Sequence, residues 1–127
     1  MIKHIVMWTL KEEALGNTKM ENGLKIKDML ETLKDELNEI IEMEDLFIRA
    51  LTSSAVYPRV VIWKVLDKNA AALIFVHNHP SGNHPSKEDI SITKKLMEVA
   101  SAIDVQVHDH IIIAGNGFYS FADHDLI

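Results

Sequence analysis

Residues 71–92 constrain the fold more than any other stretch of the chain. They begin with a short continuous apolar run, residues 71–76, whose length and composition predict a buried strand. Residues 80–85 contain two prolines and a glycine, which predict a loop. Ser86 and Asp89 then have capping-box spacing ahead of an apolar pattern with the helical period. The stretch therefore predicts a buried strand, a loop and a capped helix in succession.

Two histidines end the predicted strand. Side chains alternate along a strand, so His77 and His79 are expected to project together while Asn78 points to the other side. Both imidazoles would then face the carboxylate of Asp89 at the start of the helix. Two nitrogens, one oxygen and an open fourth position describe a catalytic zinc site better than a structural one, which four protein ligands would close.

Simpler interpretations exist for the same residues. His77 and His79 could be ordinary strand histidines, although the attached loop and capped helix favour a metal site, functional or vestigial. Asp89 could cap the helix, which contributes about 0.3–1 kcal/mol and is compatible with metal binding. For Ser86, an N-cap role is favoured over a catalytic one. His84 is expected to be exposed, or to substitute as a ligand.

Composition limits the classes of protein to consider. The chain has 127 residues, of which 47% are hydrophobic, enough for a single domain over residues 1–127 with its own core. It has no apolar run long enough to span a membrane and no secretory signal layout. Cysteine is absent, which excludes thiolate zinc sites and fits a cytoplasmic location. A net charge of −6 gives no electrostatic footprint for nucleic acid.

The strings HNHP and PSKED resemble the JAMM metal motif of MPN-fold metallopeptidases, and HNHPSG, DHIII and SF resemble its RadC branch. The resemblance covers about Leu46–Ile127. It implies an α/β fold of the three-layer-like MPN (JAB) type, with a mixed β-sheet flanked by helices. It also implies a zinc-dependent metallopeptidase or isopeptidase acting on a peptide or protein. His77, His79 and Asp89 would bind Zn²⁺, and Ser86 would act in catalysis by stabilising the oxyanion.

The sequence departs from that motif in two respects. The loop from His79 to Ser86 is one residue shorter, and the family's general-base glutamate, expected on a strand before Leu46, is not found. The nearby acids are not at family positions, so no base is nominated among Glu36, Glu39, Glu42 and Glu44. The alternative function is therefore a catalytically inactive metal-binding or protein-interaction domain on the same fold.

The opening segment differs from the rest. A strand is predicted over residues 1–10, a loop over residues 11–17, and a capping box at Thr18 before a long amphipathic helix that reaches Ile40 and Ile41. Residues 1–45 resemble the first strand and helix of the stress-responsive dimeric α/β-barrel family, which implies a homodimer through this segment. A natural fusion, a degraded gene and an engineered chimera would all give such a sequence.

The remaining elements follow from periodicity and turn residues. A short strand is predicted over residues 46–51, and a helix from Pro58 to about Asn69 with Val61, Val65 and Leu66 on its apolar face. A helix follows over residues 87–102, then strands over residues 105–113 and 118–121 joined by a tight turn.

His108, Asp109 and His110 form a second polar cluster, on the first of those two strands. Alternation predicts that the two histidines share a face. Asp109 and His110 stand where RadC proteins carry DH, and the favoured interpretation is that they hold the sheet near the site. The alternative is a contact from Asp109 or His110 to a metal-bound imidazole.

Overall fold

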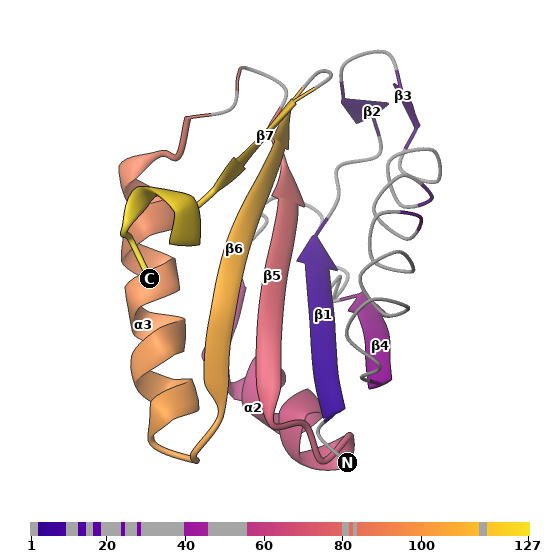
Figure 1. The fold of residues 1–127 in the computed structure, drawn as a ribbon, viewed down its shortest axis with the longest axis vertical. Helices are drawn as coiled ribbons and strands as arrows, with labels where there is room; N and C mark the ends of the chain where they lie inside the picture. The colour runs from indigo at the N-terminus through magenta and orange to yellow at the C-terminus, as the bar shows by residue number, and fades with distance from the viewer. Residues whose placement is uncertain are drawn as a thin grey trace.

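The computed structural model describes residues 3–9, 13–14, 17–18, 24, 28, 40–45, 56–79, 82, 84–114 and 117–127. A five-stranded sheet is the framework of this part of the chain (Figure 1). Its strands, in spatial order, are β4 (Ile40–Asp45), β1 (Lys3–Thr9), β5 (Ala72–Asn78), β6 (Gln106–Ala114) and β7 (Gly117–Ser120). The first four are parallel and β7 is antiparallel to β6. The sheet is therefore mixed, as expected.

Two helices accompany the sheet, α2 (Pro58–Asp67) and α3 (Lys87–Ser101). A short 3₁₀ turn, η1 (Ala122–His124), follows β7. Outside the main sheet, β2 (Glu13–Ala14) pairs with β3 (Asn17–Thr18) in a small antiparallel sheet. The combination of a mixed sheet with helices confirms the α/β fold class.

The central strand β5 is buried on both faces. Leu73 and Phe75 on one face belong to a cluster with residues of both helices. Ala72 and Val76, on the opposite face, are also buried. A parallel strand covered on both faces reads as a continuous apolar run, which explains why residues 71–76 were recognisable as a strand.

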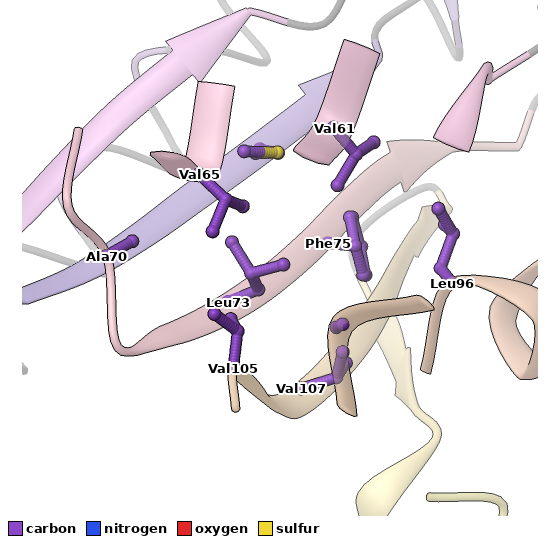
Figure 2. Packing of buried hydrophobic residues seen from close by; sticks show 10 residues of the cluster. Val61, Val65, Ala70, Leu73, Phe75, Leu96, Val105 and Val107 are labelled. Atoms are coloured by element: carbon purple, nitrogen blue, oxygen red, sulfur yellow. The ribbon is translucent and has the colours of Figure 1, made fainter. Parts of the chain in front are cut away.

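Both helices contribute to that core from one stripe of their surface. Val61 and Val65 of α2 and Leu96 of α3 pack around Phe75 (Figure 2). Each such buried side chain contributes about 1.5–3 kcal/mol relative to an exposed one. This packing holds α2 and α3 against the face of β5 that carries Leu73 and Phe75.

The predicted helix from Pro58 is confirmed, with one error on its apolar face. Pro58 occupies the first turn, and Asn69 stops the helix with a φ of 52°. Leu66, however, is 63% exposed. Val61 and Val65 are four residues apart and define the inward stripe, whereas Leu66 lies one further step, about 100°, around the helix.

The N-terminal predictions are partly confirmed. The opening strand exists as β1, and Leu24 and Asp28 are helical. Ile40 and Ile41 are not helical, because they form β4 and pair with Lys3 and His4 of β1. The predicted loop over residues 11–17 contains β2, and Thr18 lies in β3. Glu21, most of the predicted helix and the predicted strand at 46–51 lie outside the described residues.

A bilayer-spanning helix is not found in the part of the chain that the structure describes, because no helix there is both long and apolar enough.

Candidate metal centre

The two histidines project from one side of β5 at its carboxyl end, as alternation predicted. Their rings lie 4.7 Å apart, centroid to centroid, at an interplanar angle of 64°. Asn78 between them is buried on the other face. The backbone N–H of His79 donates to the carbonyl of Ile113 at 2.8 Å, so the parallel ladder to β6 continues past the end of β5. Both imidazoles are therefore held by the sheet.

The carboxylate of Asp89 is held by the predicted capping box at the start of α3. Ser86 is the N-cap, and its backbone N–H and hydroxyl each donate to Asp89 Oδ2 at 2.7 Å. In return the backbone N–H of Asp89 donates to Ser86 Oγ at 3.1 Å. These reciprocal bonds fix the rotamer of Asp89 before any ion is considered.

These three side chains meet in space. His77 Nε2 lies 3.3 Å from Asp89 Oδ1, and His79 Nε2 lies 3.1 Å from Asp89 Oδ2. One ligand atom from each residue lies within 4.8 Å of the others. Zinc bonds of about 2.0–2.2 Å in a tetrahedron separate neighbouring ligand atoms by roughly 3.3–3.6 Å. The two contacts lie near the short end of that range, and the donor types suit a divalent ion such as zinc, for which the described residues supply three ligands.

The charge of the carboxylate suits that role. Burial is the largest influence and raises the pKa of Asp89, whereas the hydrogen bonds from the Ser86 hydroxyl and backbone lower it. The neighbouring imidazoles of His77 and His79 lower the pKa further, so the net result is below its usual value of 3.8. Asp89 is therefore ionised at neutral pH, as a metal ligand must be.

His110 of β6 stands directly behind His77. His110 Nε2 lies 2.7 Å from His77 Nδ1, and His110 Nδ1 lies 2.6 Å from Thr93 Oγ1. Burial, together with the imidazoles of His77 and His79, lowers the pKa of His110 from 6.5 to about 3, although Asp89 opposes the shift. His110 is therefore neutral at physiological pH. The predicted contact to a candidate ligand is made by His110.

Asp109 has a different role. Its carboxylate accepts hydrogen bonds from Ser120 Oγ at 2.6 Å and from the backbone N–H of Ala122 at 3.0 Å. It thereby holds the C-terminal turn, which lets Phe121 stack on the ring of His110 with centroids 4.8 Å apart. The DHIII and SF strings thus form one structural unit behind His77.

The prediction that His108 and His110 share a face is wrong. Leu73 pairs with Val107 but the next residue, Ile74, pairs with Asp109, so a bulge at His108 interrupts the register. His108 is exposed, whereas Val107 and His110 are both buried. Bulges of this kind occur beside functional sites and re-aim side chains.

Two further residues complete the site's surroundings. Thr93 is a residue that the sequence analysis did not single out, and its position four residues after Asp89, one helical turn further on, is the signal that could have indicated it. His84 is exposed, with its ring 6.1 Å from that of Tyr119. Among the described residues, the group able to hold a metal is His77, His79 and Asp89, without His84.

Comparisons with known proteins point to one family. Residues 11–126 match the family model for the RadC-like JAB domain. The chain is 40% identical over 106 residues to the UPF0758 protein YfjY of Escherichia coli K12, an alignment covering 83% of this chain and 66% of that protein. It is 48% identical over 87 residues to a UPF0758 protein of Thiobacillus denitrificans, an alignment covering 68% of this chain and 39% of that protein. It is 43% identical over 94 residues to the UPF0758 protein YkfG of Escherichia coli K12, an alignment covering 73% of this chain and 60% of that protein.

The matches cover only part of each relative, and the family match includes most of the N-terminal segment. The chain spans between 39% and 66% of the lengths of these three relatives. The family match begins at residue 11, well before Leu46, where the resemblance was expected to start. Nothing in these comparisons supports the resemblance of the N-terminal segment to the dimeric α/β-barrel family.

Proposed function

The chain belongs to the RadC-like JAB domain family, and from this membership and the geometry of the site we propose that it is a zinc-dependent hydrolase of the metallopeptidase or isopeptidase type. The observation that carries the proposal is the convergence of His77, His79 and Asp89, which bring one possible ligand atom each to within 4.8 Å of the others. A zinc ion held by these side chains supplies Lewis-acid activation of water and of a substrate carbonyl. The proposed substrate is a peptide or protein.

The chain's own residues hold this site ready. The sheet orients both imidazoles, and the capping box orients an ionised Asp89. Ser86 has a single hydroxyl hydrogen, and it is donated to Asp89 Oδ2. Stabilising an oxyanion would require that hydrogen to leave Asp89. The geometry therefore supports Ser86 as the N-cap, and its catalytic role remains a prediction.

A general base is still to be identified. Glu42 and Glu44 lie in β4, which β1 separates from β5, and they pair with Ile5 and Met7. Glu36 and Glu39 lie outside the described residues. We nominate none of these acids. A general base typically contributes 10²–10⁴-fold to the rate, so its absence would reduce turnover while leaving metal binding intact.

This gap favours a second candidate function, a metal-binding or protein-interaction domain without catalysis. Its specific support is the shorter loop between His79 and Ser86 together with the missing base. The hydrolase and a non-catalytic metal-binding domain both predict zinc binding, a protein-interaction domain does not require it, and only the hydrolase predicts hydrolysis.

The experiment measures zinc content and hydrolysis on the same purified chain. Wild type is expected to bind one zinc per chain and to cleave members of a peptide and isopeptide library. His77→Ala/His79→Ala is expected to lose both properties. His84→Ala/His108→Ala is the matched control, since it removes two exposed histidines and should change neither. Stoichiometric zinc without cleavage would select a non-catalytic metal-binding domain, and no zinc in the wild type would eliminate the hydrolase and leave only a protein-interaction domain.

A further inference from the structure

We propose that Thr93 and His110 are positioning residues that hold His77 in the tautomer protonated at Nδ1, so that its Nε2 lone pair faces Asp89 and the ion. The proposal concerns a chain of hydrogen bonds that runs from the backbone of α3 to the candidate ligand. It rests on the proposed zinc site, since the orientation of that lone pair matters most when an ion is bound.

The direction of each hydrogen bond follows from the number of hydrogens. Thr93 Oγ1 lies 2.6 Å from the backbone carbonyl of Asp89, and a carbonyl can only accept, so the single hydroxyl hydrogen of Thr93 is donated there. Thr93 Oγ1 must then accept at its 2.6 Å contact with His110 Nδ1. His110 therefore carries its hydrogen on Nδ1.

The same counting continues to His77. His110 is 5% exposed, and burial favours the neutral ring, which has only one N–H. With that hydrogen on Nδ1, its Nε2 must accept at the 2.7 Å contact with His77 Nδ1. His77 therefore carries a hydrogen on Nδ1, and when the ring is neutral, as a metal ligand must be, its Nε2 is left with the lone pair that coordination uses.

Two features of β6 bring His110 into this chain. The bulge at His108 shifts the phase of the strand, so that His110 pairs with Phe75 and shares the face of His77. Phe121 then stacks on the imidazole of His110 at 4.8 Å and Phe75 packs on it edge-on at 5.9 Å. The ring is therefore clamped between aromatic side chains, and its orientation does not depend on the metal.

The series of hydrogen bonds also begins and ends at the same residue, Asp89. Asp89 offers its side chain to the ion and its backbone carbonyl to Thr93, which lies one helical turn further on. A shift of α3 would therefore disturb the carboxylate ligand and the orientation of His77 together. Outer partners of metal-ligating histidines typically influence metal affinity by 10–100-fold.

The test reads tautomers directly in the metal-free full chain. Long-range ¹H–¹⁵N spectra of histidine-labelled protein, after chelation, distinguish protonated from unprotonated ring nitrogens. Wild-type His77 is expected to be protonated at Nδ1. In His110→Phe and Thr93→Val, which keep the approximate shape but remove the polar contacts, the Nε2-protonated form should appear and zinc affinity should fall by about 10–100-fold.

Conservative variants separate this role from simple packing. His110→Gln offers one acceptor for His77 and one donor for Thr93, and Thr93→Ser keeps the hydroxyl, so both should retain near wild-type tautomer and affinity. His108→Gln changes an exposed histidine two residues away and is the control.

Several outcomes would overturn the inference. One is wild-type His77 without a hydrogen on Nδ1 in the metal-free chain, a result that needs no variant to fold. Another is full zinc affinity in a folded His110→Phe protein. Failure of wild type to bind zinc, with His77 still protonated at Nδ1, would instead remove the proposed function while leaving the hydrogen-bond chain standing.

Discussion

Asp89 uses its two carboxylate oxygens differently. Oδ2 accepts both hydrogen bonds from Ser86 and also lies 3.1 Å from His79 Nε2, while Oδ1 lies 3.3 Å from His77 Nε2. Helix capping and metal binding are thus combined in one side chain, and the two roles can be separated by removing only its charge.

Asp89→Asn is therefore expected to keep most of the helix cap and lose the ion. The amide oxygen can still accept from Ser86, so the free energy of unfolding without metal should change by only about 0.3–1 kcal/mol. The zinc dissociation constant should rise by more than about 100-fold, beyond the effect of outer partners. Glu88→Gln, an exposed charge change in the same helical turn, is the control for calorimetric titration. Wild-type affinity in Asp89→Asn would show that the carboxylate is not a ligand.

His110 makes the stability of the metal-free chain depend on pH. Its pKa is about 3 when folded and 6.5 when free, so the unfolded state binds the proton first as the pH falls. The contribution of neutral His110 to the free energy of unfolding is therefore fully present above pH 6.5. Below pH 6.5 the free energy of unfolding falls by about 1.4 kcal/mol per pH unit. Asp89, whose folded pKa lies below 3.8, contributes its own loss only at lower pH.

Urea unfolding between pH 4.5 and 6.5, in the presence of a chelator, isolates this effect of His110. His110→Gln should have a slope shallower than wild type by about 1.4 kcal/mol per pH unit. Equal slopes for the two proteins would mean that His110 is not buried as a neutral ring.

At the scale of elements, the sequence predicted the part of the site whose residues lie close together along the chain. The strand end, the loop and the capped helix lie within residues 71–92, and the positions of His77, His79 and Asp89 follow from alternation and capping. The contribution of His110 depended on a bulge. Two-residue alternation cannot reveal an inserted residue, which reverses the faces of every residue beyond it.

Deleting His108 should therefore damage the protein far more than substituting it. Without the extra residue, either Val107 or His110 must leave the buried face. Burying one valine contributes about 1.5–3 kcal/mol, so loss of Val107 from the core should lower the free energy of unfolding by at least about 1.5 kcal/mol. His108→Gln should unfold like wild type in urea. A deletion variant as stable as wild type would show that the bulge does not set the phase of β6.

The end of the N-terminal helix was also mispredicted, because strand pairing between distant segments is not visible in local sequence. Ile40 and Ile41 continue an apolar pattern of three- and four-residue steps, yet they pair with β1 in β4. Periodicity within a short apolar run does not distinguish a helix end from a strand that a distant partner stabilises. The long-range pairing decided the outcome.

At the scale of the whole molecule, the sheet and helices bring ligands from distant elements to one place. The two histidines come from β5 and the carboxylate comes from α3, and α2 and α3 pack on the same core (Figures 1 and 2). An ion bound only by the folded state would therefore stabilise the whole structure.

Zinc at 100 times its dissociation constant should raise the free energy of unfolding by about 2.7 kcal/mol, and a chelator should reverse the increase. His77→Ala/His79→Ala should show no such increase in a thermal or urea titration. Equal stabilisation of the double variant would place the zinc elsewhere on the chain.

The most direct test of the central claim is anomalous scattering at the zinc edge from crystals of the zinc-loaded chain. We expect one peak about 2.0–2.2 Å from Nε2 of His77, Nε2 of His79 and an oxygen of Asp89, with one further position open. A peak at other residues, or no peak despite saturating zinc, would contradict the assignment of these three side chains as a metal centre.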